Sequence, residues 1–206
     1  MTCKAPLAAI DTLMPLELQT SGVSKEKLAL MSTVMIPISV FAQSWVSKAY
    51  LAGEGTKPVS IFLHSYKARV VIGASLVALI HVIRAAGSAE AGFPAWVWAV
   101  GFLPLALGTA ASQIMFVAQM AFFNRVSDPK IGGTYMTMLN TIANLGGQWP
   151  APAVLALKSS LEGLSTGYDS FTLVTIPALI LGAGWITVFS GTALKLQGLK
   201  IKDWHA

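Results

Sequence analysis

The chain has 206 residues, of which 54% are hydrophobic and only 11% are charged. Soluble domains carry roughly 25% charged residues, so this composition argues against a soluble fold. The net charge of +5 does not indicate nucleic-acid binding, because the 14 Lys and Arg residues lie mostly between apolar runs. In a membrane protein that placement reports which loops face the cytosol. Cys3 is the only cysteine, which excludes an intrachain disulfide.

Apolar runs divide the chain into six expected membrane spans within one membrane domain, residues 1–206. A helix needs about 20 residues to cross the hydrocarbon core of a bilayer, and longer runs cross with some tilt. The run Ala91–Asn124 has 34 uncharged residues, too few for two crossings and a loop, so it is assigned one span. The expected spans are 3–20, 28–47, 68–86, 95–123, 131–157 and 170–194.

Two of these spans contain charges. Lys4, Asp11 and Glu17 interrupt residues 3–20, and hydropathy alone does not identify this segment as a span. Residues 68–86 have an uncharged core of only 14 residues, between Arg69 and Arg84. Both arginines are therefore expected to extend their charged ends toward the membrane surface. Ser24 is expected to cap the helix that follows the first span.

Span 131–157 carries a polar face. Its polar residues recur at three- or four-residue steps, so they line one side of a helix. An amide in hydrocarbon is costly unless it is paired or wetted, so this side is expected to face protein or a water-filled cavity. It either lines a substrate path or makes hydrogen bonds between helices. The candidates are Thr137, Asn140, Asn144 and Gln148, with Gln113 and Gln119 of the preceding span as further candidates for the cavity or for packing.

Charged residues supply a second set of candidates. Asp11 is an acid inside an expected span, which favours a coupling or gating role; the alternative is that residues 3–20 lie at the interface and Asp11 is solvated. Arg125, Asp128 and Lys130 form a charged turn between two spans. Arg125 and Lys130 are candidates for capturing a phosphate-bearing substrate, and Asp128 for a gating salt bridge. The plain alternative is that these charges only set the topology.

The residues of this region also carry a family resemblance. The segment SDPKIGGTYMTMLNTIANLGGQWP at Ser127–Pro150 resembles the signature of the acetyl-coenzyme A transporters, solute carrier family 33 of the major facilitator superfamily. Thr2-Cys3-Lys4, the SKEKLAL at Ser24–Leu30 and Gly92-Phe93-Pro94 extend it. The resemblance reaches about Leu194 and corresponds to the C-terminal half of a family member.

The resemblance implies an all-α, six-helix membrane bundle equivalent to the C-terminal half of a major facilitator carrier. It further implies import of acetyl-CoA from the cytosol into the lumen of the endoplasmic reticulum, with no prosthetic cofactor. Carriers of this class place their site between two halves, so the chain alone is not expected to transport. Its expected partners are the lipid bilayer and either a second six-helix half or a homodimer mate.

The sequence leaves two alternatives to transport. One is a non-transporting half-carrier that pairs with or regulates another membrane protein. The other, a multi-pass enzyme such as an acyltransferase, is disfavoured because the sequence shows no acid–base pair within a span. A metal site is also disfavoured, since His64, His81 and His205 lie in different segments without metal-ligand spacing.

The distribution of basic residues predicts the topology. One set of loops, together with the tail, holds nine basic residues, and the opposite turns hold four. This bias predicts that the side with nine basic residues is cytosolic and that both termini lie on that side. The nine are Lys48, Lys57, Lys67, Arg69, Arg125, Lys130, Lys195, Lys200 and Lys202, and the four are Lys25, Lys27, Arg84 and Lys158.

Overall fold

The computed structural model describes residues 2–53, 55–85, 95–128, 130–163, 169–199 and 204. These residues form helices and no strand, which confirms the expected all-helical membrane bundle. The helices are α1 (Ala5–Thr20), α2 (Lys25–Tyr50), α3 (Pro58–Ala85), α4 (Ala95–Val126), α5 (Gly132–Gln148), α6 (Pro150–Gly163) and α7 (Ser170–Gly198). Gly92, Phe93 and Pro94 of the family resemblance, Lys200 and Lys202 of the topology prediction, and His205 lie outside the described residues.

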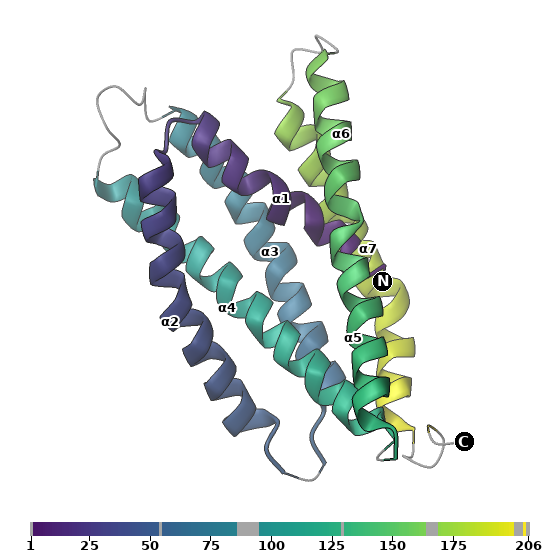
Figure 1. Cartoon of the computed structure of the whole chain (residues 1–206). Helices are drawn as coiled ribbons and strands as arrows, with labels where there is room; N and C mark the ends of the chain where they lie inside the picture. Colours follow the sequence, from purple (N-terminus) through teal and green to yellow (C-terminus); the bar gives the residue numbers. More distant parts are fainter. Residues whose placement is uncertain are drawn as a thin grey trace.

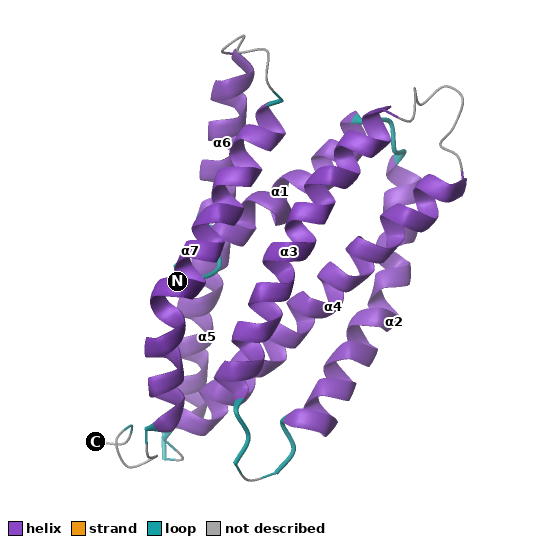
Figure 2. Ribbon diagram, turned by 180° about the vertical axis from the view of Figure 1, so that it is seen from behind, coloured by secondary structure: helices purple, strands orange, loops and turns teal. Residues whose placement is uncertain are grey.

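The helices form two groups joined by α1 and α3. In Figure 1, α2 and α4 lie on one side and α5, α6 and α7 on the other, while α1 runs obliquely across the middle of the bundle. Figure 2, from behind, shows α3 between the two groups. α1 packs against α3, α5, α6 and α7, and α2 packs against α4. Helices α1, α3 and α6 end at the upper end of Figure 1, and α2 and α4 end at the lower end.

Four helices of the described chain are long and apolar enough to cross a membrane. They are Lys25–Tyr50, Pro58–Ala85, Val100–Val126 and Ser170–Gly198. Residues 131–157, expected as one span, instead form two helices placed end to end. Trp149 keeps helical dihedral angles between them and its N–H donates to the Leu145 carbonyl at 3.2 Å, while Pro150 begins α6.

α1 forms much of the core, although its charges hide it from hydropathy. Half of its 16 residues are buried, including Leu7, Ile10 and Leu13. The latter two pack with Leu76, Ile80 and other residues of α3 and α7 in the larger apolar cluster. At the end of α1 the chain turns at Gly22, with a φ of 96°, and Ser24 then caps α2. The Ser24 hydroxyl accepts a hydrogen bond from the Lys27 N–H at 3.4 Å, which confirms the expected cap.

Glycines let the start of α1 lie close to two other helices. A Cβ added at Gly182 of α7 would lie 3.3 Å from the Cβ of Pro6 and 3.3 Å from the hydroxyl of Tyr66. One added at Gly147 of α5 would lie 3.6 Å from the Cδ of Lys4. These close contacts fix the start of α1 between α5 and α7, and they set where its charged side chains point.

Candidate functional site

An ion pair joins α1 to α3 inside the bundle. The Arg69 guanidinium donates to the Asp11 carboxylate. The side chain of Arg69 is only 12% exposed, whereas that of Asp11 is 53% exposed. Arg69 therefore does not extend to the membrane surface as expected. A buried guanidinium needs a compensating anion, and α1 supplies one.

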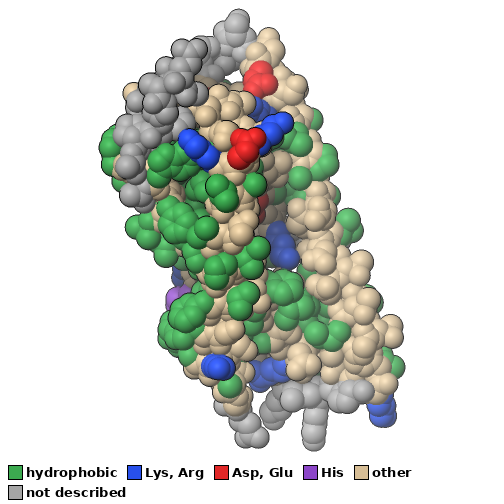
Figure 3. Space-filling model, turned by 60° about the vertical axis from the view of Figure 1, so that its left-hand side comes forward, with side chains coloured by type: hydrophobic (Ala, Val, Ile, Leu, Met, Phe, Trp, Pro, Cys, Tyr) green, Lys and Arg blue, Asp and Glu red, His purple; other side chains and the backbone are tan. Residues whose placement is uncertain are grey.

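The pair lies where two cavities adjoin. One cavity, of about 440 Å³, is bounded by α1, α3, α4 and Gly147 of α5. The other, of about 390 Å³, extends between α1, α2, α3 and α4. Both are lined by Asp11, Arg69, Ser112 and Gln113. The space-filling view in Figure 3 shows a hollow part-way down one face of the molecule with a basic side chain inside it.

The walls of these cavities carry amides as well as charges. The Gln43 amide of α2 donates to the Gln113 carbonyl oxygen of α4 at 2.8 Å. Gln119, one turn and a half further along α4, lines the larger cavity, and its amide nitrogen is buried without a hydrogen-bond partner among the described residues. Lys4 lines the same cavity. Two cations and one carboxylate thus leave this lining with a net positive charge, suited to an anionic ligand that also offers hydrogen-bond acceptors.

The sequence-predicted residues fall into two sets. Gln113 and Asp11 lie in the cavity walls. The polar face of α5 does not line either cavity. Asn140 is half-buried, with its side-chain oxygen buried and unpartnered among the described residues. The remaining residues of that face, Thr137, Asn144 and Gln148, are exposed on the surface of this chain.

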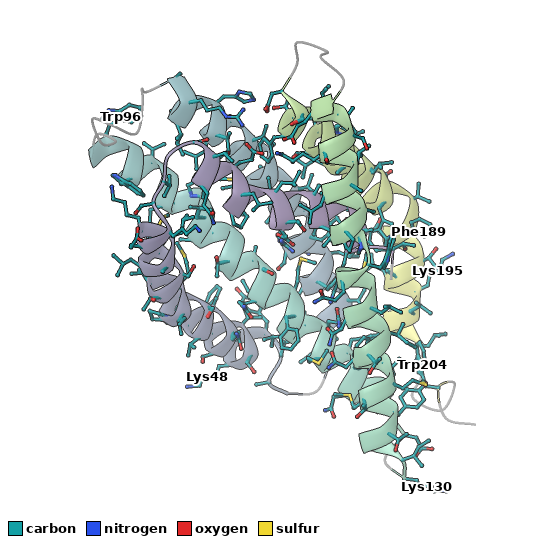
Figure 4. The ribbon with its side chains drawn as sticks, turned by 45° about the horizontal axis from the view of Figure 1, so that its top comes forward. Lys48, Trp96, Lys130, Phe189, Lys195 and Trp204 are labelled. Carbon is teal, nitrogen blue, oxygen red and sulfur yellow. The ribbon has the colours of Figure 1, made fainter. Side chains whose placement is uncertain are left out.

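The charged turn lies away from the cavities, at the lower end of the bundle. Arg125 donates to the Thr56 carbonyl at 3.2 Å, which ties α4 to the loop before α3. Asp128 accepts from the Lys130 backbone N–H at 2.9 Å, a local turn contact. Lys130 is exposed, and Figure 4 shows it at the same lower end as Lys48 and away from Trp96.

A second cluster of charges occupies the upper end, which Figure 3 shows as a gathering of acidic and basic side chains. Glu17 of α1, only 3% exposed, accepts from Arg84 of α3 and lies 3.1 Å from the amino group of Lys158 of α6. Arg84 also contacts Asp169, the cap of α7, at 2.8 Å. Lys158 further contacts Glu162. We call these five residues the end network.

The end network favours the ionised form of Asp169. Burial acts to raise the pKa of the Asp169 carboxyl, but hydrogen bonds from Thr172 and Arg84 outweigh it, so this pKa lies below its usual value. The carboxylate also accepts from the Thr172 N–H at 3.1 Å and so caps α7. Each cation of the network contacts two carboxylates, which is the arrangement of a structural tie between helices rather than of an open site.

Sequence reasoning missed Arg69 and Lys4 as site residues. Arg69 was expected at the membrane surface, and Lys4 was treated as a charge that interrupts the first expected span. The available signal was the match between two interrupted spans: residues 3–20 carry two acids, and residues 68–86 carry two arginines. Each of these acids pairs with one of these arginines.

Comparison with known families identifies the chain. The family model described as acetyl-coenzyme A transporter 1 matches residues 1–178. The chain belongs to this family. The match confirms the resemblance carried by Ser127–Pro150, and it includes all the residues that line the two cavities.

Two yeast relatives extend the comparison for this member of the acetyl-coenzyme A transporter 1 family. It is 33% identical over 158 residues to the uncharacterized protein C21B10.09 of Schizosaccharomyces pombe, a match that covers 77% of the chain and 29% of the relative. It is 45% identical over 51 residues to the uncharacterized membrane protein YBR220C of Saccharomyces cerevisiae, which covers 25% of the chain and 9% of the relative. The matches thus span less than a third of either relative. No solved structure matches the chain.

Proposed function

We propose that this chain is part of a carrier that moves acetyl-CoA across a membrane, from the cytosol into the lumen of the endoplasmic reticulum. Membership of the acetyl-coenzyme A transporter 1 family supports the substrate. The observation that carries the proposal is the polar cavity around Arg69, inside a bundle of membrane-spanning length. An ionisable residue at such a position is most often part of a substrate or ion path.

The cavity suits the chemistry of acetyl-CoA. This molecule carries a pyrophosphate and a ribose phosphate, and a guanidinium binds phosphate oxygens through two parallel hydrogen bonds. Arg69 and Lys4 are the proposed phosphate contacts, because both line the larger cavity. Gln113 and Gln119 line it too, and their amides are the proposed contacts for neutral acceptors of the ligand. The proposed role, which the family supports, is transport rather than acetyl transfer.

The six-span arrangement is part of the proposal. Four helices have the length and composition of spans; α1 would be the fifth, and α5 with α6 the sixth. The bundle would then equal one half of a major facilitator carrier, which binds its substrate between two halves. Both ends of the chain are proposed to be cytosolic, on the side where Lys48 and Lys130 lie. Figure 1 shows the C-terminus at this lower end and the N-terminus part-way up the bundle.

The exposed face of α5 favours an interaction with a partner protein. Thr137, Asn144 and Gln148 point away from the rest of the chain. Left against lipid, unpaired amides are unfavourable, so a second six-helix half or a homodimer mate is proposed to cover them. In the assembled carrier this face, with Asn140, would form the opposite wall of the substrate path. Arg125 and Lys130 are proposed to attract the anionic substrate at the cytosolic end, and Asp128 to act in gating there.

The test is uptake of radiolabelled acetyl-CoA into proteoliposomes that contain the purified chain, with its oligomeric state measured beforehand. We expect saturable uptake only from assemblies with two halves, and we expect Arg69→Gln to abolish it. Arg125→Gln is the matched control outside the cavity, and it should raise the KM with little effect on the maximal rate. Absence of saturable uptake from every assembly would reject transport, and uptake by a monomer would reject the need for a second half.

The same exposed face favours a second candidate, a non-transporting half-carrier that pairs with or regulates another membrane protein. In that case the α5 face is a protein interface and the cavity has no transport role. Asn144→Leu separates the two. A loss of assembly without any acetyl-CoA uptake in the wild type favours the half-carrier, whereas lowered uptake at unchanged expression favours the carrier.

A further inference from the structure

The Arg69 pair is asymmetric in its access to solvent. The Arg69 side chain is largely but not fully buried, and Asp11 is the only acid with which it forms a salt bridge among the described residues. The Asp11 side chain is about half exposed and lines both cavities. A ligand in either cavity therefore has more access to the carboxylate than to the guanidinium, although both groups line the cavity walls.

We infer that Asp11 is an internal counter-ion which a phosphate group of the ligand displaces from Arg69. This inference rests on the proposed function and assigns to Asp11 the position beside Arg69 that a phosphate group of the ligand takes on binding. A guanidinium held out of water is unstable without an anion, so an empty site needs a substitute for the ligand. A carboxylate offers the same two-oxygen geometry as a phosphate.

The exchange is feasible because only one partner has to move. A half-exposed carboxylate returns to water at small cost, whereas a buried guanidinium does not. Lys4, which makes no salt bridge among the described residues, adds a second positive charge to the same wall. Once Asp11 turns away, the cavity presents two cations, which favours a ligand with several negative charges over a neutral one.

The end network shows the contrasting arrangement. Glu17 is almost fully buried and contacts two cations, and Asp169 caps a helix as well as contacting Arg84. Asp169 and Glu162 each contact a single cation, but neither of them lines either cavity. Asp11 is thus the acid of the described chain whose position fits a displaceable counter-ion.

The test is equilibrium binding of acetyl-CoA to the purified full chain in detergent at low ionic strength. We expect Asp11→Asn to bind acetyl-CoA about three- to tenfold more tightly, because the ligand no longer competes with a carboxylate. Arg69→Gln should weaken binding by more than tenfold. Glu26→Gln, which removes the same charge at an exposed position of α2, should leave binding unchanged.

A neutral ligand and a charge swap complete the test. S-acetylpantetheine, which has no phosphate, should gain nothing from Asp11→Asn. The double variant Asp11→Arg, Arg69→Asp should restore thermal stability but not acetyl-CoA binding, since the guanidinium then sits on the exposed side. Equal or weaker binding by Asp11→Asn, or binding restored by the swap, would show a structural pair and overturn the inference. Absence of binding by the wild type would instead reject the proposed function together with it.

Discussion

The two charged regions of this bundle are built from the same kinds of residue. They differ in how completely their charges are compensated by ion pairs. In the end network, Glu17, Arg84, Lys158 and Asp169 contact each other across four elements, with the most buried acid held by two cations. In the cavity, Asp11 and Arg69 form one pair between two open spaces. A network with each charge compensated ties helices together, whereas a single pair beside a cavity leaves a charge that a ligand can use.

Breaking the end network at Glu17 should have the largest effect on stability. Glu17→Ala leaves Arg84 and Lys158 without their shared buried acid, and loss of one partner from a buried ion pair costs about 3–5 kcal/mol. Thermal and denaturant unfolding in detergent would measure the loss. Glu162→Gln, at the exposed rim of the same network, is the control and should change the melting temperature little. Equal effects of the two variants would contradict a buried structural tie.

A purely steric change at the contact between α7 and α1 should have the next largest effect on stability. Gly182→Val places its side chain against Pro6 and Tyr66, and overpacking of this kind costs about 1–3 kcal/mol. Both charged regions keep their residues, so the variant separates helix packing from charge. Gly184→Val is the matched control, because nothing lies within 4 Å of a Cβ at that position. If both valines destabilise equally, the cause is helix propensity and not contact with α1.

A hydrogen bond between neutral side chains beside the cavity should contribute less to stability than either the end network or the packing at Gly182. Gln43→Leu removes the hydrogen bond to Gln113, and bonds of this type between membrane helices contribute about 0.6–2 kcal/mol. Unfolding of this variant would be compared with that of Ser44→Leu, an exposed position on α2. Restored stability in the double variant Gln43→Leu, Gln113→Leu would support an isolated pair. Unchanged stability in Gln43→Leu would show that this bond does not hold α2 to α4.

The smallest expected effect is the acid dependence of the end network. The pKa of Asp169 is lowered in the folded chain, so its contribution to stability is present above the pKa of the unfolded chain, about 3.9. That contribution is lost as the pH falls below this value toward the folded pKa. Melting temperatures between pH 5 and pH 3 would show it as a steeper fall for the wild type than for Asp169→Asn. Parallel curves would remove Asp169 from the network.

The sequence predicts the all-helical membrane class of this fold better than it predicts α1, the helix at the centre of the bundle. Long uncharged runs identify α2, α4 and α7 because hydropathy depends on composition alone. The same measure undervalues α1, since it penalises Asp11 and Glu17 one at a time, whereas α3 remains apolar enough to be identified despite Arg69 and Arg84. In the bundle these charges compensate each other between the two helices, so the segment least like a span is the most buried helix.

The candidate site was predicted in part for a related reason. Gln113 and Asp11 line the cavities, as their place inside expected spans suggested. Helical periodicity grouped the α5 face, but periodicity does not state which neighbour the face meets. On this chain three of its four residues are exposed, and Asn140 alone turns partly inward. Arg69 was missed because its partner lies 58 residues away in the sequence.

The most direct test of the contrast between the two regions is the stabilisation that acetyl-CoA gives to Arg69→Gln and to Arg84→Gln. A ligand at about 100 times its Kd stabilises a protein by about 2.7 kcal/mol, which a thermal shift detects. We predict that Arg84→Gln lowers the melting temperature of the ligand-free chain more, yet keeps the shift caused by acetyl-CoA. Arg69→Gln should lose that shift. A shift retained by Arg69→Gln and lost by Arg84→Gln would contradict the assignment of the cavity as the binding site and of the end network as structural.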